Sequence, residues 1–206
     1  MVRTIGGQDT DRMEALSDGL FAIVLTLLIL QFEVPNVPPD ELPAAVTDQG
    51  TLLFSYLLSF FVVGLYWIVH HNIFQHIVRH DRVLLWLNLI FLLTVSFLPF
   101  PTELIGTYGT QFAWTLYALN IILVGLSLTV VWAYAAREEY LSDEISDRTA
   151  WLVTGRGLIS PLVFLLSIGV AAVSLTLAFY IVLLIIPLQM YWVRRYRREL
   201  EPFDEE

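Results

Sequence analysis

Long apolar runs separated by short polar segments dominate the chain. From Gly19 to Leu30 only Thr26 has a polar side chain. A helix of about 20 residues, rising about 1.5 Å per residue, matches a hydrocarbon core about 30 Å thick. The pattern therefore predicts a first membrane-spanning helix with a charged motif at its entrance. A cleaved signal peptide is disfavoured, because Asp18 immediately precedes the run and Gln31 to Pro35, rather than small residues, follow it.

The remaining apolar runs predict five more spans. The last run, Leu158 to Tyr191, would be about 50 Å long as one helix, which is too long for one span and right for two. The turn between these two spans is expected between Gly169 and Thr176. We therefore expect an all-α integral membrane protein that forms a single six-helix domain over residues 1–206. The expected spans are residues 15–34, 51–72, 83–99, 111–136, 152–172 and 175–196.

The segments between the runs are expected to be irregular. Residues 1–11 are predicted to be a short lead, residues 36–49 an acidic loop with prolines, and residues 74–82 a polar turn. The sequence Pro99-Phe100-Pro101 is expected to end the third span, since proline cannot continue a helix. A loop is expected to follow at residues 102–110.

The distribution of arginine predicts the orientation in the membrane. All 11 basic residues are arginines, and with six spans every one of them falls on the same side. All charged residues in the loops on the opposite side are acidic. They are Glu33, Asp40, Glu41, Asp48 and Glu103. Because positive charge stays on the cytoplasmic side, we expect both termini in the cytoplasm. Five spans would place the four C-terminal arginines outside.

Composition excludes several classes of function. The chain is 57% hydrophobic and 15% charged, whereas soluble domains are about 25% charged. It has no cysteine, so disulfides, thiolate nucleophiles and cysteine metal sites are impossible. The net charge of −9 argues against nucleic acid as a partner.

Catalytic and metal-binding motifs are also missing from the sequence. No G-x-S-x-G motif occurs. His76 and His80 are four residues apart and could share a helix face, but no HExxH motif accompanies them. Residues 107–110 faintly resemble a carbonyl selectivity filter, yet their turn chemistry favours a turn. We therefore expect that the protein is not an enzyme and that it binds neither a cofactor nor a metal.

Polar side chains gather at the cytoplasmic end of the first three spans. Ionisable groups inside a span cost about 2.5–3.5 kcal/mol each and need partners, so a shared network would satisfy them. A structural clamp between the spans is favoured, since buried polar groups must first be satisfied. A proton relay or pH sensor is the alternative, because histidine titrates near neutrality. The candidates are Arg12, Ser17, Asp18, Trp67, His70, His71 and Asn88.

A helical wheel of the first span separates two faces. Ile23, Leu27 and Leu30 share one face, and Thr26 flanks it. Asp18 is rotated about 140° from Ile23, so the apolar stripe and the carboxylate cannot serve the same surface. One face could line a symmetry axis while the other packs on neighbouring helices. Periodicity alone favours packing on both faces, with Asp18 capping the helix start.

Motifs in the first three spans carry a resemblance to a known family. The first span opens R-x-x-x-L-S-D from Arg12 to Asp18 and continues as G-x-F-A-I. The second ends W-x-x-H-H from Trp67 to His71, and the third contains L-L-W-L-N and S-F-L-P-F-P between Leu84 and Pro101. These motifs resemble the prokaryotic members of the transmembrane protein 175 family of potassium channels. The phenylalanine of the family's first motif is Leu16 here.

The resemblance implies a homotetramer whose first spans line a central pore without a carbonyl filter. Carried over by position, the constriction would be Ile23, with Leu27 and Leu30 above it, and Thr26 would be the hydroxyl linked to cation preference. The polar residues named above would form the family's interhelix network. The implied function is a potassium-permeable cation channel in a prokaryotic plasma membrane, with the bilayer and monovalent cations as partners.

Two other functions stay open. One is a proton-coupled transporter or proton leak that uses Asp18 and the histidines of the second span. The other is a non-conducting scaffold, in which the polar cluster serves only folding.

Overall fold

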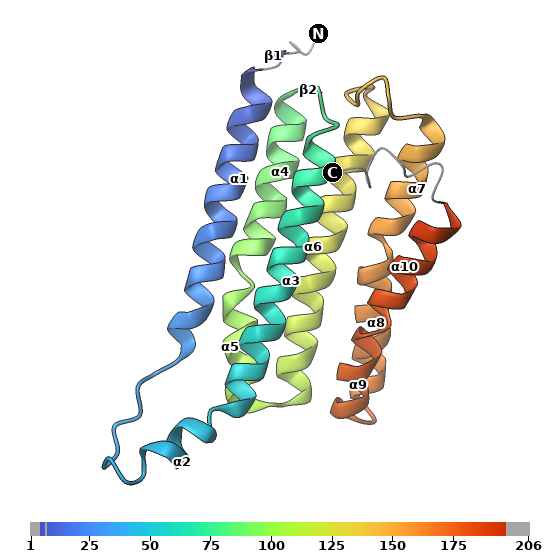
Figure 1. Ribbon diagram of the computed structural model, residues 1–206. Helices are drawn as coiled ribbons and strands as arrows, with labels where there is room; N and C mark the ends of the chain where they lie inside the picture. The colour runs from blue at the N-terminus through green and yellow to red at the C-terminus, as the bar shows by residue number, and fades with distance from the viewer. Residues whose placement is uncertain (1–4, 7, 197–206) are drawn as a thin grey trace.

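The computed structural model describes residues 5, 6 and 8–196. Over these residues the chain forms a bundle of long helices that run roughly along one axis (Figure 1). Within the described part, six helical segments are long and apolar enough to cross a membrane. The expected all-α membrane fold with six spans is therefore confirmed. The segments are Thr10–Gln31, Leu42–Phe74, Arg82–Tyr108, Gln111–Arg137, Asp147–Ala171 and Leu175–Arg195.

The first span consists of α1 (Gln8–Leu27) and a 3-10 turn, η1 (Leu28–Gln31). The helix begins earlier than expected, within the segment predicted to be an irregular lead. Part of that segment lies outside the described residues, but Ile5–Gly6 forms β1, which pairs antiparallel with β2 (Arg79–His80). The polar turn before the third span thus holds the start of the chain through backbone hydrogen bonds.

The second span is α3 (Gly50–Phe74), and the short helix α2 (Leu42–Thr47) precedes it. The prediction of a plain loop at residues 36–49 was therefore wrong over α2. Pro43 lies in the first turn of α2, where a helix tolerates proline because the first N–H groups have no intrahelical partner anyway.

The third span is broken in the middle. The helix α4 (Arg82–Ser96) ends just before the prolines, as expected, but α5 (Pro99–Tyr108) follows at once. The prediction of a loop at 102–110 was wrong over residues 102–108, because a proline that ends one helix is well suited to begin the next. The turn falls only at Gly109, whose φ is 55°, a left-handed conformation that favours glycine.

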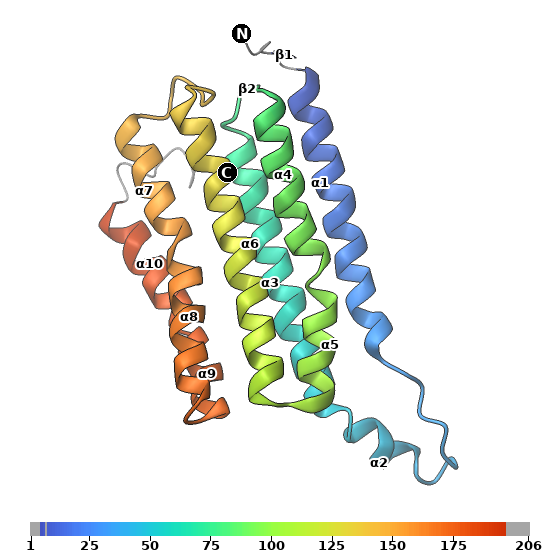
Figure 2. The same ribbon diagram turned by 180° about the vertical axis from the view of Figure 1, so that it is seen from behind.

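The central helix of the bundle is α6 (Gln111–Arg137). Its side chains Trp114, Tyr117 and Trp132 are among the largest that are fully buried. The indole of Trp132 donates to the carbonyl of Ala150 at 3.0 Å. The helix α6 therefore packs against both the first half of the chain and the hairpin that follows it (Figure 2).

Four shorter helices complete the last two spans. They are α7 (Asp147–Gly157), α8 (Ile159–Ala171), α9 (Leu175–Val182) and α10 (Ile185–Arg195). The turn between the two spans lies within the region expected from the sequence, and Ser174 caps α9 by accepting from the N–H of Leu177 at 3.3 Å. A Cβ added at Gly125 of α6 would lie 2.8 Å from Pro161 of α8, so this glycine allows the two helices to approach closely.

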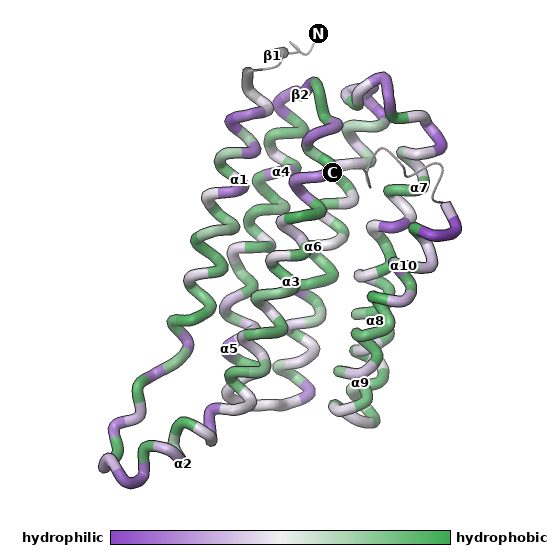
Figure 3. Tube along the Cα trace, in the orientation of Figure 1, coloured by the Kyte–Doolittle hydropathy of each residue, from purple (hydrophilic) through white to green (hydrophobic). Residues whose placement is uncertain are grey.

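The hydropathy of the residues varies along the axis of the bundle. Hydrophobic residues predominate along the middle of the helices, and hydrophilic segments gather at the two ends (Figure 3). Many large apolar side chains on the outside are exposed, including Phe61 and Leu93. A surface of this kind is stable in lipid and not in water. The end that carries Arg79, Arg82 and Arg137 is called the arginine-rich end below.

Candidate functional site

One face of the first span is apolar and uncovered. The exposed fractions of the side chains are 59% for Ile23, 41% for Leu27 and 71% for Leu30. Thr26 is also exposed, and its hydroxyl donates to the carbonyl of Ile23 at 2.7 Å. In both views α1 lies at the edge of the bundle (Figures 1 and 2). The three apolar residues that share a face on the helical wheel thus share an exposed face in the structure.

The opposite face of the span packs against α3 and α4. Met13, Phe21, Val24 and Leu28 are buried there, at the spacing that one helix face requires. The buried side chains of α1 that pack against the bundle therefore form a different stripe from the one that contains Ile23. Leu16, which replaces the phenylalanine of the family motif, is 54% exposed and does not belong to the buried stripe.

A chain of hydrogen bonds joins the first three spans at the arginine-rich end. The Nε2 atom of His70 lies 3.2 Å from Oδ1 of Asn88, and Nδ2 of Asn88 donates to Oγ of Ser17 at 3.2 Å. Ser17 in turn donates to the carbonyl of Met13 at 2.9 Å. The amide oxygen can only accept, so Nε2 of His70 carries a proton in this arrangement. The chain links α3, α4 and α1, and its three side chains are at most 1% exposed.

Aromatic rings enclose His70. Its imidazole stacks on Phe74 at 4.0 Å between ring centroids and on Phe91 at 5.4 Å. The ring of Phe21 lies 6.0 Å away. The imidazole therefore has little freedom to turn, and its hydrogen bond to Asn88 is fixed in direction.

A second polar contact lies outside the buried chain. The indole Nε1 of Trp67 donates to Oδ1 of Asp18 at 2.8 Å. His71 stacks on Trp67 at 6.0 Å and lies 3.1 Å from Nε2 of Gln75. The expected network is thus divided into a buried chain and an exposed pair, with His71 beside the pair. Among the side chains that the structure describes, none of these residues forms a hydrogen bond or ion pair with Arg12, which is exposed.

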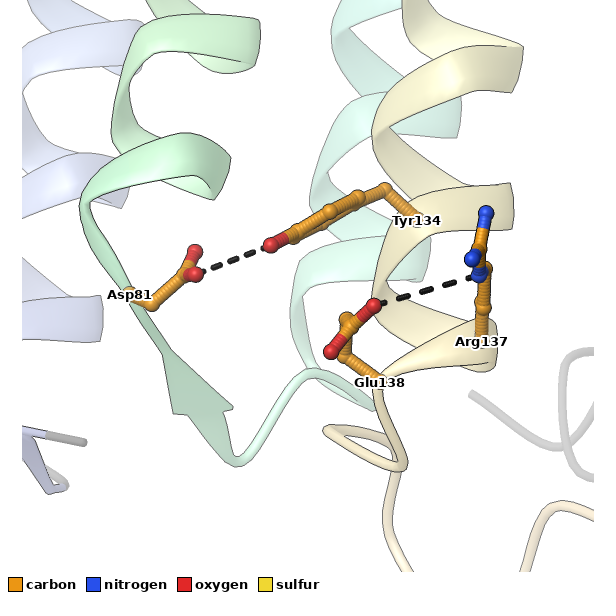
Figure 4. Close-up of polar contacts among 4 residues, drawn as sticks. All are labelled: Asp81, Tyr134, Arg137 and Glu138. Atoms are coloured by element: carbon orange, nitrogen blue, oxygen red, sulfur yellow. Dashed lines mark hydrogen bonds and ion pairs between the residues drawn. The ribbon is translucent and has the colours of Figure 1, made fainter. Parts of the chain in front are cut away.

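Sequence reasoning did not find a further polar cluster at the same end. The carboxylate of Asp81 is buried, caps α4 by accepting from the N–H of Leu84 at 2.9 Å, and accepts from the hydroxyl of Tyr134 at 2.8 Å (Figure 4). Nδ1 of the buried His80 lies 3.3 Å from Oγ1 of Thr10. An aspartate just before an apolar run signals a helix cap, but its second partner on α6 could not be inferred from spacing.

The electrostatics of this cluster extend to the loop after α6. Burial, together with the nearby carboxylates of Asp81 and Glu138, raises the pKa of Tyr140 above its ordinary value. The phenol therefore stays neutral at physiological pH. Arg137 and Glu138 form an exposed ion pair at 3.9 Å (Figure 4). Within the described residues, no group of three or more metal-ligating side chains gathers around His76 and His80 or elsewhere.

These features define a class of protein. It is a helical membrane protein with six spans, in which the first helix has an exposed apolar face and is joined to the second and third spans by a buried chain of hydrogen bonds. A family model described as "Endosomal/lysosomal potassium channel TMEM175" matches residues 12–99, the stretch that contains every candidate site residue. A potassium channel of Streptomyces collinus is 36% identical over 179 residues, which is 82% of this chain and 87% of that protein. One of Chamaesiphon minutus is 34% identical over 155 residues, 72% of this chain and 76% of that protein.

The solved structures agree with the sequence relatives. A crystal structure of a lysosomal potassium-selective channel TMEM175 homolog from Chamaesiphon minutus superposes with a TM-score of 0.77 at 26% identity, covering 92% of this chain and 98% of that one. The protein of Danio rerio named endosomal/lysosomal proton channel TMEM175 is 40% identical over 103 residues, but these cover 46% of this chain and 20% of that protein. The chain belongs to the TMEM175 family, as the sequence motifs predicted. It is a member of a family of channels and not an enzyme.

The buried chain predicts energetic coupling between Ser17 and Asn88. Alanine at either position leaves a buried polar partner unsatisfied, so each single variant is expected to lose about 1–3 kcal/mol of unfolding free energy. The double variant is expected to lose less than the sum, with a coupling of about 0.5–3 kcal/mol. Unfolding with dodecyl sulfate in mixed micelles provides the measurement.

Ser96 on α4 supplies a matched control for this cycle. It is exposed, and its hydroxyl donates to Leu93 of its own helix at 2.9 Å. The effects of Ser96→Ala and Asn88→Ala should add. Additivity of Ser17→Ala and Asn88→Ala would instead mean that the two side chains do not stabilise each other.

Proposed function

We propose that the protein is a potassium-permeable cation channel of a prokaryotic plasma membrane, formed by four copies of the chain with α1 of each copy at the central axis. The observation that carries the proposal is the exposed apolar face of α1, in a chain whose bacterial relatives are named potassium channels. Another stripe of α1 already serves packing within the protomer. An exposed stripe at the edge of the bundle is therefore available to meet its own copies around an axis.

In this proposal Ile23 forms the constriction. Four of its side chains around an axis make a ring that holds water back when it is narrow. Leu27 and Leu30 extend the same apolar surface away from the arginine-rich end of the bundle. Opening requires α1 to tilt or rotate so that the ring widens and becomes hydrated.

Thr26 contributes the polar group beside the constriction. Its hydroxyl proton is used in the bond to the carbonyl of Ile23, so its oxygen is left with lone pairs that can accept. An oxygen oriented in this way suits a partly dehydrated cation and disfavours an anion. Selection among monovalent cations then rests on the cost of dehydration at the ring.

The buried polar chain acts as a clamp in this proposal. Ser17 lies six residues before Ile23 on the same helix, so the position of the ring depends on how Ser17 is held. The hydrogen bonds of the chain end on the backbone carbonyl of Met13, which cannot pass a proton on. The arrangement therefore favours a structural function over a proton relay for His70, Asn88 and Ser17.

A proton-coupled transporter or proton leak remains the second candidate. It is favoured by the names of the animal relatives, which are called proton channels. Asp18 is the residue to which such a function would fall. It is exposed on the same helix as Ile23, and among the hydrogen bonds described its carboxylate accepts only from the indole of Trp67.

A ring of polar side chains at position 23 should hold water and pass more potassium than the apolar ring of Ile23. Ile23→Asn places amides at the proposed constriction, so potassium flux into liposomes is expected to rise severalfold while discrimination against sodium falls. Leu162→Asn is the matched control, because Leu162 on α8 is 62% exposed, close to the 59% of Ile23. It should leave flux unchanged. Wild-type flux in Ile23→Asn would mean that Ile23 does not line the pore.

Assembly around α1 can be tested with cysteine, because the chain has none of its own. In Ile23→Cys a short bis-maleimide is expected to link pairs of protomers into covalent dimers, since each protomer offers one thiol at the axis. Leu162→Cys should stay monomeric on a denaturing gel. Native mass measurement should give four copies. Monomeric Ile23→Cys would contradict the proposed place of α1.

The proton alternative is separated from the channel by Asp18→Asn. The amide keeps an oxygen for the indole of Trp67 but cannot titrate. Under the channel proposal this variant keeps its potassium flux, and the dependence of flux on pH between 5 and 8 stays as in the wild type. Glu14→Gln, one turn earlier, is the control. A steep pH dependence that disappears only in Asp18→Asn, with assembly intact, would favour the proton alternative.

A further inference from the structure

A cavity in the second half of the bundle has no part in the proposed pore. It measures about 330 Å³ and lies between α3 and α6 on one side and α7, α8 and α10 on the other. Its walls are mainly apolar and include Leu65, Val69 and Leu128. Cavities that hold small amphiphiles and cofactors begin at about this volume.

The cavity opens at the outer surface of the bundle, beside α10. Ile186 and Met190 of α10 belong to its lining and are 61% and 47% exposed. No residue of α10 is buried over its described length, Ile185–Arg195, so this helix covers the cavity without sealing it. A molecule in the surrounding bilayer can therefore enter from the side.

The polar end of the cavity is built around one cation. Arg156 is the charged residue among the described residues that line it. Its Nε donates to Oε1 of Gln189 at 2.9 Å, and Nε2 of Gln189 lies 3.4 Å from the carbonyl of Arg156. These two contacts tie α7 to α10 and hold the plane of the guanidinium group. A guanidinium ion stays charged at all physiological pH values, and its planar set of donors matches phosphate.

The cavity begins near the arginine-rich end and extends along the apolar part of the bundle. Arg156 is nine residues from the start of α7, or about 14 Å along the helix. It therefore lies within the candidate span Asp147–Ala171. A side chain on a helix leans toward the helix N-terminus, so the long side chain of Arg156 extends back toward the arginine-rich end. From Ile73 at the arginine-rich end, the lining of α3 continues about 12 Å deeper to Leu65. Arg194 and Arg195 end α10 on the same side.

We infer that this cavity binds an anionic phospholipid of the leaflet at the arginine-rich end. The phosphate of the headgroup contacts Arg156, and one acyl chain lies along the apolar wall of α3 and α6. Arg156 is the one charged residue among the described residues that line the cavity. A headgroup with a net negative charge neutralises it, whereas the ammonium group of a zwitterionic lipid finds no carboxylate among these lining residues. Gln189 is a positioning residue that orients Arg156.

The test titrates the purified full-length protein in detergent with phosphatidylglycerol and, separately, phosphatidylcholine, and counts bound lipids by native mass spectrometry. The wild type is expected to bind phosphatidylglycerol about tenfold more tightly than phosphatidylcholine, and Arg156→Gln is expected to lose about that factor. Arg137→Gln is the matched control. It removes the same charge at the same end, from a side chain that is 85% exposed and outside the cavity.

A second pair of variants tests the apolar part of the site. Ile186→Trp narrows the mouth from an exposed position and should reduce the binding of phosphatidylglycerol without disturbing the core. Leu188→Trp changes an exposed residue of the same helix outside the lining and should have no effect. Equal binding by the wild type and Arg156→Gln, or equal losses in Arg156→Gln and Arg137→Gln, would overturn the inference. Lipid binding is measured without ion flux, so its failure leaves the proposed channel function standing.

Discussion

The hydrogen-bonded chain from His70 through Asn88 to Ser17 is the constraint on which the rest of the structure depends. Inside a bilayer no water is available to replace a lost partner, so each polar group must be satisfied by the protein. Here every donor finds an acceptor on a different helix or on its own backbone. The chain thereby fixes the rotation of α1 about its own axis. Turning α1 by one residue would withdraw Ser17 from Asn88, and the same rotation would carry Ile23 away from its exposed position.

A second contact holds the other end of the same span. Nε2 of Gln31, at the end of η1, donates to the carbonyl of Pro99 at 3.0 Å. This carbonyl lies at the break between α4 and α5, where the two prolines interrupt the third span. The first span is thus attached to the third at both ends, and the apolar face with Ile23 lies between the attachments. A change in the tilt of α1 has to be absorbed at Ser17, at Gln31, or at both.

Hydropathy was sufficient to predict the six spans, because the thickness of the bilayer sets the length of an apolar run. It was insufficient at the prolines of the third span, since Pro99 ends one helix and begins another. The polar residues could be assigned to one depth from sequence, but not to their partners. Periodicity could not separate Asn88, which reaches Ser17, from Arg12, which does not. It also could not show that Phe21, Val24 and Leu28 are buried whereas Ile23 is exposed, because an apolar residue suits either environment in a membrane-spanning helix.

The second span lies between the cavity and the contacts around α1. Tyr66, Val69 and Ile73 line the lipid-facing cavity, whereas Trp67, His70 and Phe74 form the polar and aromatic contacts around α1. The two sets alternate along α3 and occupy two adjacent faces of the helix. Because a helix moves as one body over such a short stretch, any molecule that displaces one face of α3 also displaces the other. The helix that holds the buried chain in register is therefore also one wall of the cavity.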